Sequence, residues 1–253
     1  MRGRSRAVLL LGIFAASVAA AQTRETLVVR GKSQEIRLYG SEGGPPVVLT
    51  SGDGGFVHLG PAVAEFLALK GYFVVGVDAK AYLTSFTSGS TTLSPTDVPG
   101  DYRVFVERAL KGRDLKVTLV GVSEGAGLSI LAASDPGLQK SLQGVVALGL
   151  PDVNELGWRW RDSIIYITHQ APNEPSFHAS DYVTRRGALP LAALHSTHDE
   201  FVPVETVRKV LGPEAPSRRL WLIEAADHRF SNNQPELQAR LLEAFAWVKS
   251  KAY

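Results

Sequence analysis

The stretch from Lys116 to Leu131, KVTLVGVSEGAGLSIL, predicts a buried strand that turns directly into a helix. Its first half is aliphatic and β-branched without polar alternation, which is typical of a strand covered on both faces of a parallel sheet. Its second half repeats apolar residues at helical spacing. The pattern G-x-S-x-G, residues 121–125, falls at the junction, so Ser123 is predicted on a tight turn that exposes its hydroxyl above the sheet. An incidental serine in a glycine-rich turn is the other interpretation.

The elements around this stretch alternate between strand and helix. Strands are predicted at residues 27–30, 35–39, 46–51, 72–77, 117–122, 144–150, 191–196 and 219–224, and helices at 61–69, 98–110, 204–211 and 235–249. The first two strands flank a short turn and are expected to pair antiparallel, and Asp97 is expected to cap the second helix. This order predicts an α/β protein with a mainly parallel sheet, helices on both faces, and a site at the carboxyl ends of the strands.

Residues 1–21 have the region order of a secretory signal peptide: three arginines, an apolar run from residue 7 to 16, and then small residues. Ala19 and Ala21 fit the small-x-small rule, so we predict cleavage after Ala21 and a periplasmic or secreted protein. A retained membrane anchor is the alternative, but the apolar run is too short to cross ~30 Å of hydrocarbon comfortably. One domain is predicted over residues 22–253, because no repeat or composition break divides them.

Charge and cysteine content exclude several kinds of function. Removal of residues 1–21 takes away three arginines and changes the formal charge from +2 to −1, so no nucleic-acid partner is expected. The chain has no cysteine, which excludes disulfides and thiolate metal sites. His169 and His178 lie nine residues apart without a third ligand nearby, so neither a metal nor a cofactor is predicted.

An acid and a histidine follow the serine in the chain order of an α/β-hydrolase triad. Asp199 lies in the loop after the strand at residues 191–196, and His228 lies in the loop after the strand at 219–224. We expect His228 to take the proton of the Ser123 hydroxyl as general base. Asp199 is expected to hold the imidazole in the required tautomer and to stabilise its protonated form. These residues predict the α/β-hydrolase fold.

Other residues compete for these roles. Glu200 is the nearest substitute for the acid. An aspartate shortly before a Val-Pro pair is also common in turns, so a purely structural turn residue is the alternative interpretation of Asp199. Asp227 is disfavoured, since a neighbour in sequence seldom faces its own histidine. His198 is out of chain order. A surface histidine near a helix start is the alternative interpretation of His228.

Two backbone amides are predicted to form an oxyanion hole, which stabilises the negative charge that develops on the attacked carbonyl oxygen. One is the amide of Glu124, at the start of the helix that follows the serine. The other comes from the glycine-rich loop at residues 52–55, where the amide of Asp53 is preferred to that of Gly54.

Several motifs together resemble those of the VirJ/AcvB-type bacterial virulence proteins. They are Leu49-Thr50-Ser51-Gly52-Asp53-Gly54-Gly55, Val75-Gly76-Val77-Asp78, Gly121-Val122-Ser123-Glu124-Gly125 and Asp227-His228-Arg229-Phe230. The resemblance spans about residue 46 to the C-terminus and implies an exported α/β-hydrolase with Ser123 as nucleophile. From the activity associated with AcvB-like members, it implies hydrolysis of the aminoacyl ester of lysyl-phosphatidylglycerol. Phe56 keeps the family's aromatic residue after the glycine-rich loop, whereas Glu124 stands where the family has an aromatic residue after the nucleophile.

The carboxylates of Asp53 and Glu124 need an explanation, because a negative charge near the oxyanion hole destabilises the oxyanion. One reason is local: Glu124 opens a helix, whose dipole favours an acid by ~0.3–1 kcal/mol, and Asp53 shapes its turn. The other is that both carboxylates bind a cation, such as an ammonium group of a lysyl ester. On this second interpretation Asp53 and Glu124 are also substrate-binding residues.

Residues 151–187 predict no regular element. They carry Trp158, Trp160, Tyr166, Phe177 and Tyr182 among prolines. A cap over the site would have this composition, because aromatic side chains offer apolar contact with few rotamers to freeze. Irregular packing at the sheet edge fits the same residues.

The predicted function is that of an exported serine hydrolase that cleaves an ester. The resemblance implies an aminoacylated phospholipid at the membrane surface as the substrate. A general carboxylesterase or an acyl-carbohydrate esterase is the first alternative. The second is a catalytically idle hydrolase fold that binds an envelope or secretion assembly, which a reaction of Ser123 with a fluorophosphonate would exclude.

Overall fold

The computed structural model describes residues 22–159, 162 and 174–251. The predicted signal peptide, residues 1–21, lies outside the described residues. So do residues 160–161 and 163–173 of the predicted cap segment, which include Trp160, Tyr166 and His169.

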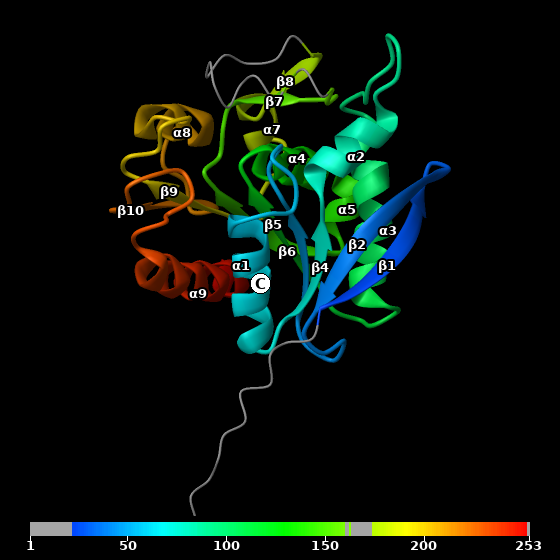
Figure 1. Cartoon of the computed structure of the whole chain (residues 1–253). Coiled ribbons are helices and arrows are strands. Elements are labelled where there is room, and N and C mark those ends of the chain that lie inside the picture. Colours follow the sequence, from blue (N-terminus) through cyan, green and yellow to red (C-terminus); the bar gives the residue numbers. More distant parts are fainter. Residues whose placement is uncertain (1–21, 160–161, 163–173, 252–253) are drawn as a thin grey trace, which may run out of the picture.

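An eight-stranded sheet forms the centre of the fold (Figure 1). Its strands are β1 (Thr23–Val29), β2 (Lys32–Tyr39), β3 (Pro46–Thr50), β4 (Phe73–Val77), β5 (Val117–Val122), β6 (Leu142–Leu148), β9 (Leu191–Ser196) and β10 (Arg218–Ile223). Their order in the sheet is β1-β2-β4-β3-β5-β6-β9-β10. The pairs β1–β2 and β2–β4 are antiparallel, and all pairs from β4 to β10 are parallel. The predicted mainly parallel sheet with an antiparallel start is confirmed.

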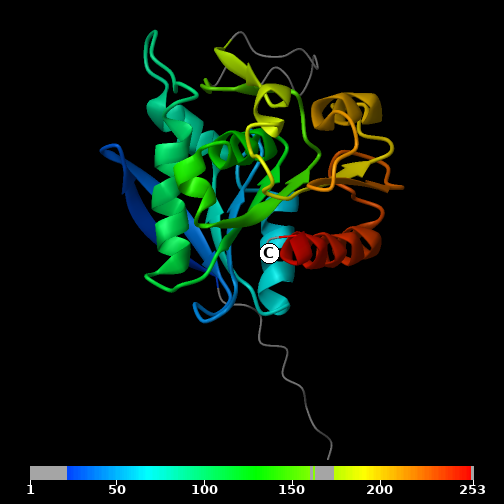
Figure 2. The same ribbon diagram turned by 180° about the vertical axis from the view of Figure 1, so that it is seen from behind.

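Helices cover both faces of this sheet, as predicted (Figures 1 and 2). They are α1 (Leu59–Leu69), α2 (Ala79–Phe86), α3 (Val98–Leu110), α4 (Glu124–Ala133), α5 (Pro136–Gln139), α7 (Ser180–Val183), α8 (Val204–Leu211) and α9 (Gln234–Lys251). Helices α1 and α9 share a buried cluster with Val47 and Leu49 of β3, whereas α2, α3 and α4 share another with Val48. Because neighbouring residues of β3 are buried on opposite faces, the strand is apolar without alternation.

Helix α2 and the side chain of Asp97 differ from the sequence predictions. The chain forms α2 where the sequence pattern predicts no helix, and the carboxylate of Asp78 caps it by accepting the backbone N–H of Ala81 at 3.1 Å. Asp97 stands before α3 as expected, but the prediction that its side chain caps this helix is wrong. Its carboxylate instead accepts the backbone N–H of Ser94 at 2.8 Å, which closes the turn before the helix.

A small antiparallel hairpin of β7 (Val153–Glu155) and β8 (Ser176–His178) lies beyond the carboxyl ends of the parallel strands (Figure 1). It belongs to the segment for which a cap and irregular edge packing were the two interpretations. The buried side chain of Asn154 rests on α4: a Cβ added to Gly127 would lie 1.9 Å from its Oδ1. The hairpin therefore contacts the helix that follows Ser123.

Candidate active site

Ser123 occupies the turn between β5 and α4, where its backbone has φ 51° and ψ −118°. A residue with a Cβ is strained there by about 1–3 kcal/mol, so the surrounding fold must hold it. A Cβ on Gly121 would lie 2.2 Å from the carbonyl oxygen of Gly125, and one on Gly125 would lie 2.3 Å from that of Thr50. The two glycines of the motif thus stand where strand and helix cross with no room for a side chain.

His228 and Asp199 meet from the loops after β10 and β9. Nδ1 of His228 lies 2.6 Å from Oδ2 of Asp199, and Oδ1 accepts the backbone N–H groups of Phe201 and Val202 at 3.0 and 2.8 Å. Burial acts to raise the pKa of Asp199, but the hydrogen bond and charge of His228 and the Val202 N–H outweigh it and hold the pKa below its usual range. An ionised Asp199 keeps the proton on Nδ1 and leaves Nε2 as an acceptor.

The competing residues have other contacts. Oε2 of Glu200 accepts the backbone N–H of His228 at 2.7 Å, so this carboxylate supports the histidine loop and not the ring. Asp227 accepts two backbone N–H groups of its own loop. The side chain of His198 is 64% exposed. Of the candidates named from the sequence, Asp199 is the acid that faces the imidazole.

Ser123 and His228 line the same cavity of about 420 Å³. Within the part of the chain that the structure describes, no hydrogen bond joins their side chains; such contacts often tighten only when substrate is bound. The imidazole lies against Gly149, where an added Cβ would be 2.5 Å from Cε1. Three exposed apolar side chains also line the cavity, those of Val57, Val153 and Phe201. The cavity can therefore hold a molecule with an apolar part beside the hydroxyl.

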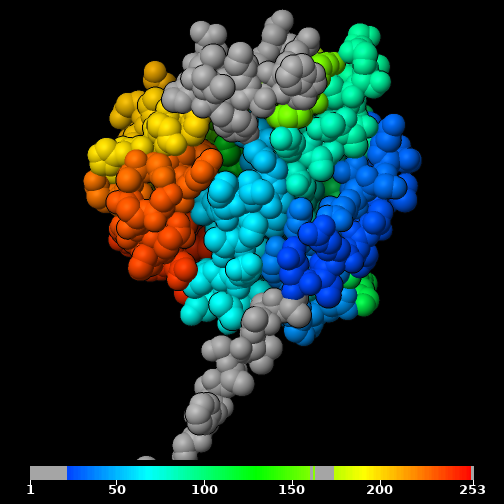
Figure 3. Space-filling view, viewed as in Figure 1, coloured from blue at the N-terminus to red at the C-terminus, as the bar shows by residue number. Residues whose placement is uncertain are grey.

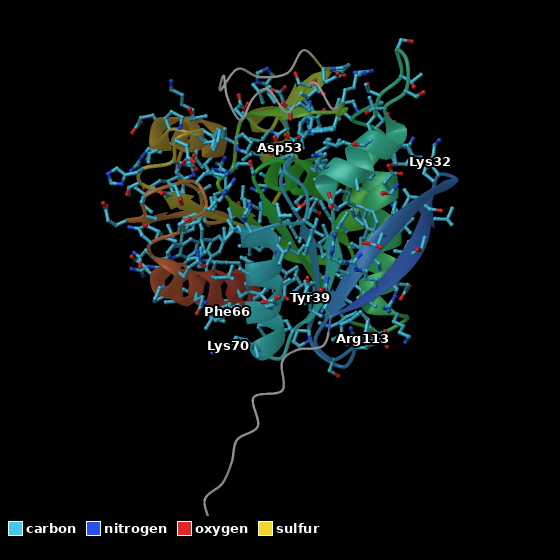
Figure 4. The ribbon with its side chains drawn as sticks, in the orientation of Figure 1. Lys32, Tyr39, Asp53, Phe66, Lys70 and Arg113 are labelled. Atoms are coloured by element: carbon cyan, nitrogen blue, oxygen red, sulfur yellow. The ribbon has the colours of Figure 1, made fainter. Side chains whose placement is uncertain are left out.

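The loop after β3 brings the other predicted amides to this cavity. Gly55 donates its N–H to the carbonyl of Gly52 at 3.0 Å, which closes a tight turn with Asp53 and Gly54 at its corner. Neither these two residues nor Glu124 donates a backbone N–H in the described hydrogen bonds. Asp53 lies below the β7–β8 hairpin (Figure 4). In the space-filling view, residues after β3 (cyan) adjoin those after β10 (orange) (Figure 3). The predicted oxyanion donors line the cavity, and their N–H groups have no acceptor within the described residues.

Glu155, at the end of β7, is a cavity residue that the sequence pattern does not single out. It is 7% exposed and Glu124 is 4% exposed, and both line the cavity, where each carboxyl group acts on the pKa of the other. Burial, and then the charge and hydrogen bond of Glu155, raise the pKa of Glu124 well above its usual range. Burial also raises the pKa of Glu155, while its hydrogen bond with Glu124 opposes this. Of the two carboxyl groups, Glu124 is the one whose pKa is raised more strongly.

The acidic side chains of the cavity do not have the geometry of a metal site. Among residues 22–159, 162 and 174–251, no three His, Asp or Glu side chains are grouped so that they could hold a metal ion.

No helix in the described residues is long and apolar enough to cross a bilayer.

Solved structures share this fold at low sequence identity. A membrane phospholipase A described as a bacterial virulence factor superposes with a TM-score of 0.63 and 16% identity, over 90% of this chain and 87% of that one. An esterase of Pyrococcus furiosus gives 0.65 and 19%, over 90% and 91%. Naproxen esterase of Bacillus subtilis gives 0.67 and 14%, over 89% and 92%. These similarities establish the α/β-hydrolase fold.

Sequence comparison matches only the first part of the site. No curated protein matches the chain. Residues 46–155 match the family model of the bacterial virulence protein VirJ. The matched residues include the glycine-rich loop, Ser123 and Glu155, whereas Asp199 and His228 lie beyond them. The predicted resemblance is therefore confirmed over residues 46–155: this chain has the α/β-hydrolase fold, and a segment of it matches the VirJ family model.

Proposed function

We propose that this chain is an exported serine hydrolase that cleaves an ester through Ser123, His228 and Asp199. The observation that carries the proposal is the 2.6 Å contact of His228 Nδ1 with Asp199 Oδ2, in a cavity that the strained Ser123 also lines. Residues 1–21 support export to the periplasm, because arginines, an apolar run and small residues follow one another as in a signal peptide.

In the proposed mechanism, the Ser123 hydroxyl attacks the ester carbonyl while Nε2 of His228 takes its proton. The free amides of Glu124 and of Asp53 or Gly54 donate to the oxyanion that forms. The protonated imidazole then gives its proton to the leaving alcohol, and an acyl group remains on the serine. Water, activated by the same imidazole, releases the acid.

The substrate class that we favour is an aminoacyl ester of a phospholipid, such as lysyl-phosphatidylglycerol. The match to the VirJ family and the acidic wall of the cavity support it. Asp53 and Glu155 supply most of the charge of this wall, because burial and the neighbouring Glu155 raise the pKa of Glu124 well above its usual range. A membrane phospholipase A among the proteins of similar fold is in keeping with an ester at a membrane surface.

A general carboxylesterase is the second candidate, because exposed apolar side chains line the same cavity and suit a neutral acyl group. An acyl-carbohydrate esterase would need polar contacts around a sugar. The carboxylesterase and carbohydrate-esterase hypotheses differ from the lipid hypothesis in the charge and the size of the preferred substrate.

The first experiment is a fluorophosphonate probe on the mature chain, residues 22–253. We expect the parent to be labelled at Ser123 and Ser123→Ala to remain unlabelled while its thermal midpoint shows that it is folded. An unlabelled parent would instead support the idle fold that binds an envelope or secretion assembly. A second experiment compares lysyl-phosphatidylglycerol in vesicles with short neutral esters and acetylated sugars. Faster hydrolysis of the lipid is expected.

A further inference from the structure

We propose that Glu155 is a positioning residue whose carboxylate accepts a hydrogen bond from the protonated carboxyl group of Glu124. This bond holds the turn of Ser123 against β7, and it is lost when the shared proton dissociates. The stability part of this proposal stands alone. The part about turnover rests on the proposed hydrolase function.

The contact joins two elements of different parts of the chain. Glu124 is the first residue of α4 and follows Ser123 directly, whereas Glu155 is the last residue of β7. Next to this contact, Asn154 is fully buried on the backbone of α4 at Gly127, where no side chain would fit. Strand β7 therefore lies on the first turns of α4 at two successive residues.

The surroundings require that the pair holds a proton. Both carboxyl groups are at least nine-tenths buried, and two adjacent buried carboxylates repel each other in a region that solvates charge poorly. Asp53 and Asp162 add negative charge. Oε1 of Glu124 is buried with no hydrogen-bond partner among the described residues. A neutral carboxyl tolerates such an oxygen, but an ionised one would leave a buried charge unsatisfied.

No cation is in contact with the pair within the described residues, although charged groups stand around it. From α3, the hydroxyl of Tyr102 is near Glu124, and it donates a hydrogen bond to Thr50. The cavity wall also carries Asp152, Glu200, His58, His228 and Arg229. An Arg or Lys beside the pair would allow both carboxylates to ionise and would make the shared proton unnecessary.

The direction of the pH effect follows from the raised pKa of Glu124. In the unfolded chain this carboxyl loses its proton above its ordinary pKa, whereas in the folded chain it keeps the proton to higher pH. Stability contributed by the pair is therefore complete at low pH and is lost as pH rises towards the folded pKa. When the proton goes to solvent, the two carboxylates repel, β7 loses its hold on the turn, and the amide of Glu124 is no longer fixed for the oxyanion.

The test compares Glu155→Gln, Glu155→Ala and a control, Glu107→Gln, which alters an exposed acid on α3. Thermal midpoints are measured between about pH 5 and about pH 9. The parent and the control should lose stability as pH rises. Glu155→Gln should lose part of this slope, because it removes the neighbouring charge that raises the pKa of Glu124, while the burial of Glu124 remains. An unchanged slope in Glu155→Gln would overturn the proposal.

The second readout is kcat against pH for a good ester substrate. Glu155→Ala should lose about tenfold in kcat at low and neutral pH, because a misplaced turn is costly to catalysis, and Glu155→Gln should restore most of it. The difference between Glu155→Ala and the parent should shrink at alkaline pH, where the parent loses the same hold. Glu155→Gln should also retain activity at alkaline pH where the parent declines. A Glu155→Ala variant with the parent's kcat and pH profile would refute the positioning role. A parent that cleaves no ester would refute the hydrolase function, and the stability measurements would still decide the pair.

Discussion

The imidazole of His228 lies against the backbone of Gly149, which has φ +59°. A Cβ added to Gly149 would lie only 2.5 Å from Cε1 of the ring, so there is no room for one. Gly149 follows the end of β6, so this contact fixes the ring from the strand next to that of the nucleophile. It complements the hydrogen bond that Nδ1 of the ring donates to Asp199.

Gly149→Ala should therefore displace the imidazole and lower kcat/KM by at least about tenfold. The backbone strain of an alanine at positive φ should also cost about 1–2 kcal/mol in the free energy of unfolding. Gly187→Ala is a matched control, because Gly187 has φ +60° with nothing within 4 Å. It should lose similar stability and no activity. Equal activity of the two variants would show that the ring tolerates the methyl group.

Ser123→Ala and Ser123→Gly should both abolish hydrolysis, since both lack the hydroxyl. Glycine accepts the backbone geometry at φ 51° without strain, whereas alanine keeps the strain of the serine. The glycine variant should thus be more stable than the alanine variant by about 1 kcal/mol after the entropy of the unfolded chain is counted. Denaturant unfolding of both variants measures this difference. Equal stabilities would mean that the turn is not strained.

Asp199→Asn should lower kcat by about 10⁴, because an asparagine favours the wrong tautomer of His228. Glu200→Gln should cost much less, since Glu200 accepts only the backbone N–H of His228. Steady-state kinetics of the two variants on the same ester decides between them. The reverse ranking would make Glu200 the acid of the site.

A cationic ester should be preferred to its neutral isostere. Hydrogen-bonded contacts to charged groups contribute about 1.5–3 kcal/mol, or roughly ten- to a hundredfold in kcat/KM. The preference should shrink most in Asp53→Asn, which removes a charge of the wall, and less in Glu124→Gln, because the pKa of Glu124 is already raised well above its usual range. Added salt should weaken the preference. The measurement is kcat/KM for a lysyl ester and for the matching uncharged ester. A parent enzyme that does not distinguish the two would end the idea of a cation-binding wall.

Sequence patterns predict the strands and helices well where packing is on both faces or follows a clear period. The bounds of β9 and α8 agree with the prediction to the residue. Helix α2 was not predictable in this way, because Lys80, Thr84 and Ser85 interrupt its apolar residues, and only the cap at Asp78 marks its start. The Asp97 side chain was misassigned because the same residue type serves a cap and a turn equally well.

For the site, chain order is enough to choose Ser123, Asp199 and His228, because each follows a predicted strand of one parallel sheet. The pairing of Glu124 with Glu155 is of another kind. It depends on how a short hairpin from an irregular segment lies on α4, and no periodicity near Glu155 reports that contact. A carboxyl group in the nucleophile motif is the only local sign that a partner is needed.

The order of strands also bears on when the protein becomes active during folding. The nucleophile turn lies among β3, β5 and α4 at the centre of the sheet, whereas the proposed acid and base follow β9 and β10, which lie at one end of the strand order and come last in the chain. A chain whose last strand has not yet joined the sheet would hold a strained serine without its base. Ester hydrolysis would therefore appear only when folding is complete, and not at the earlier collapse of the chain.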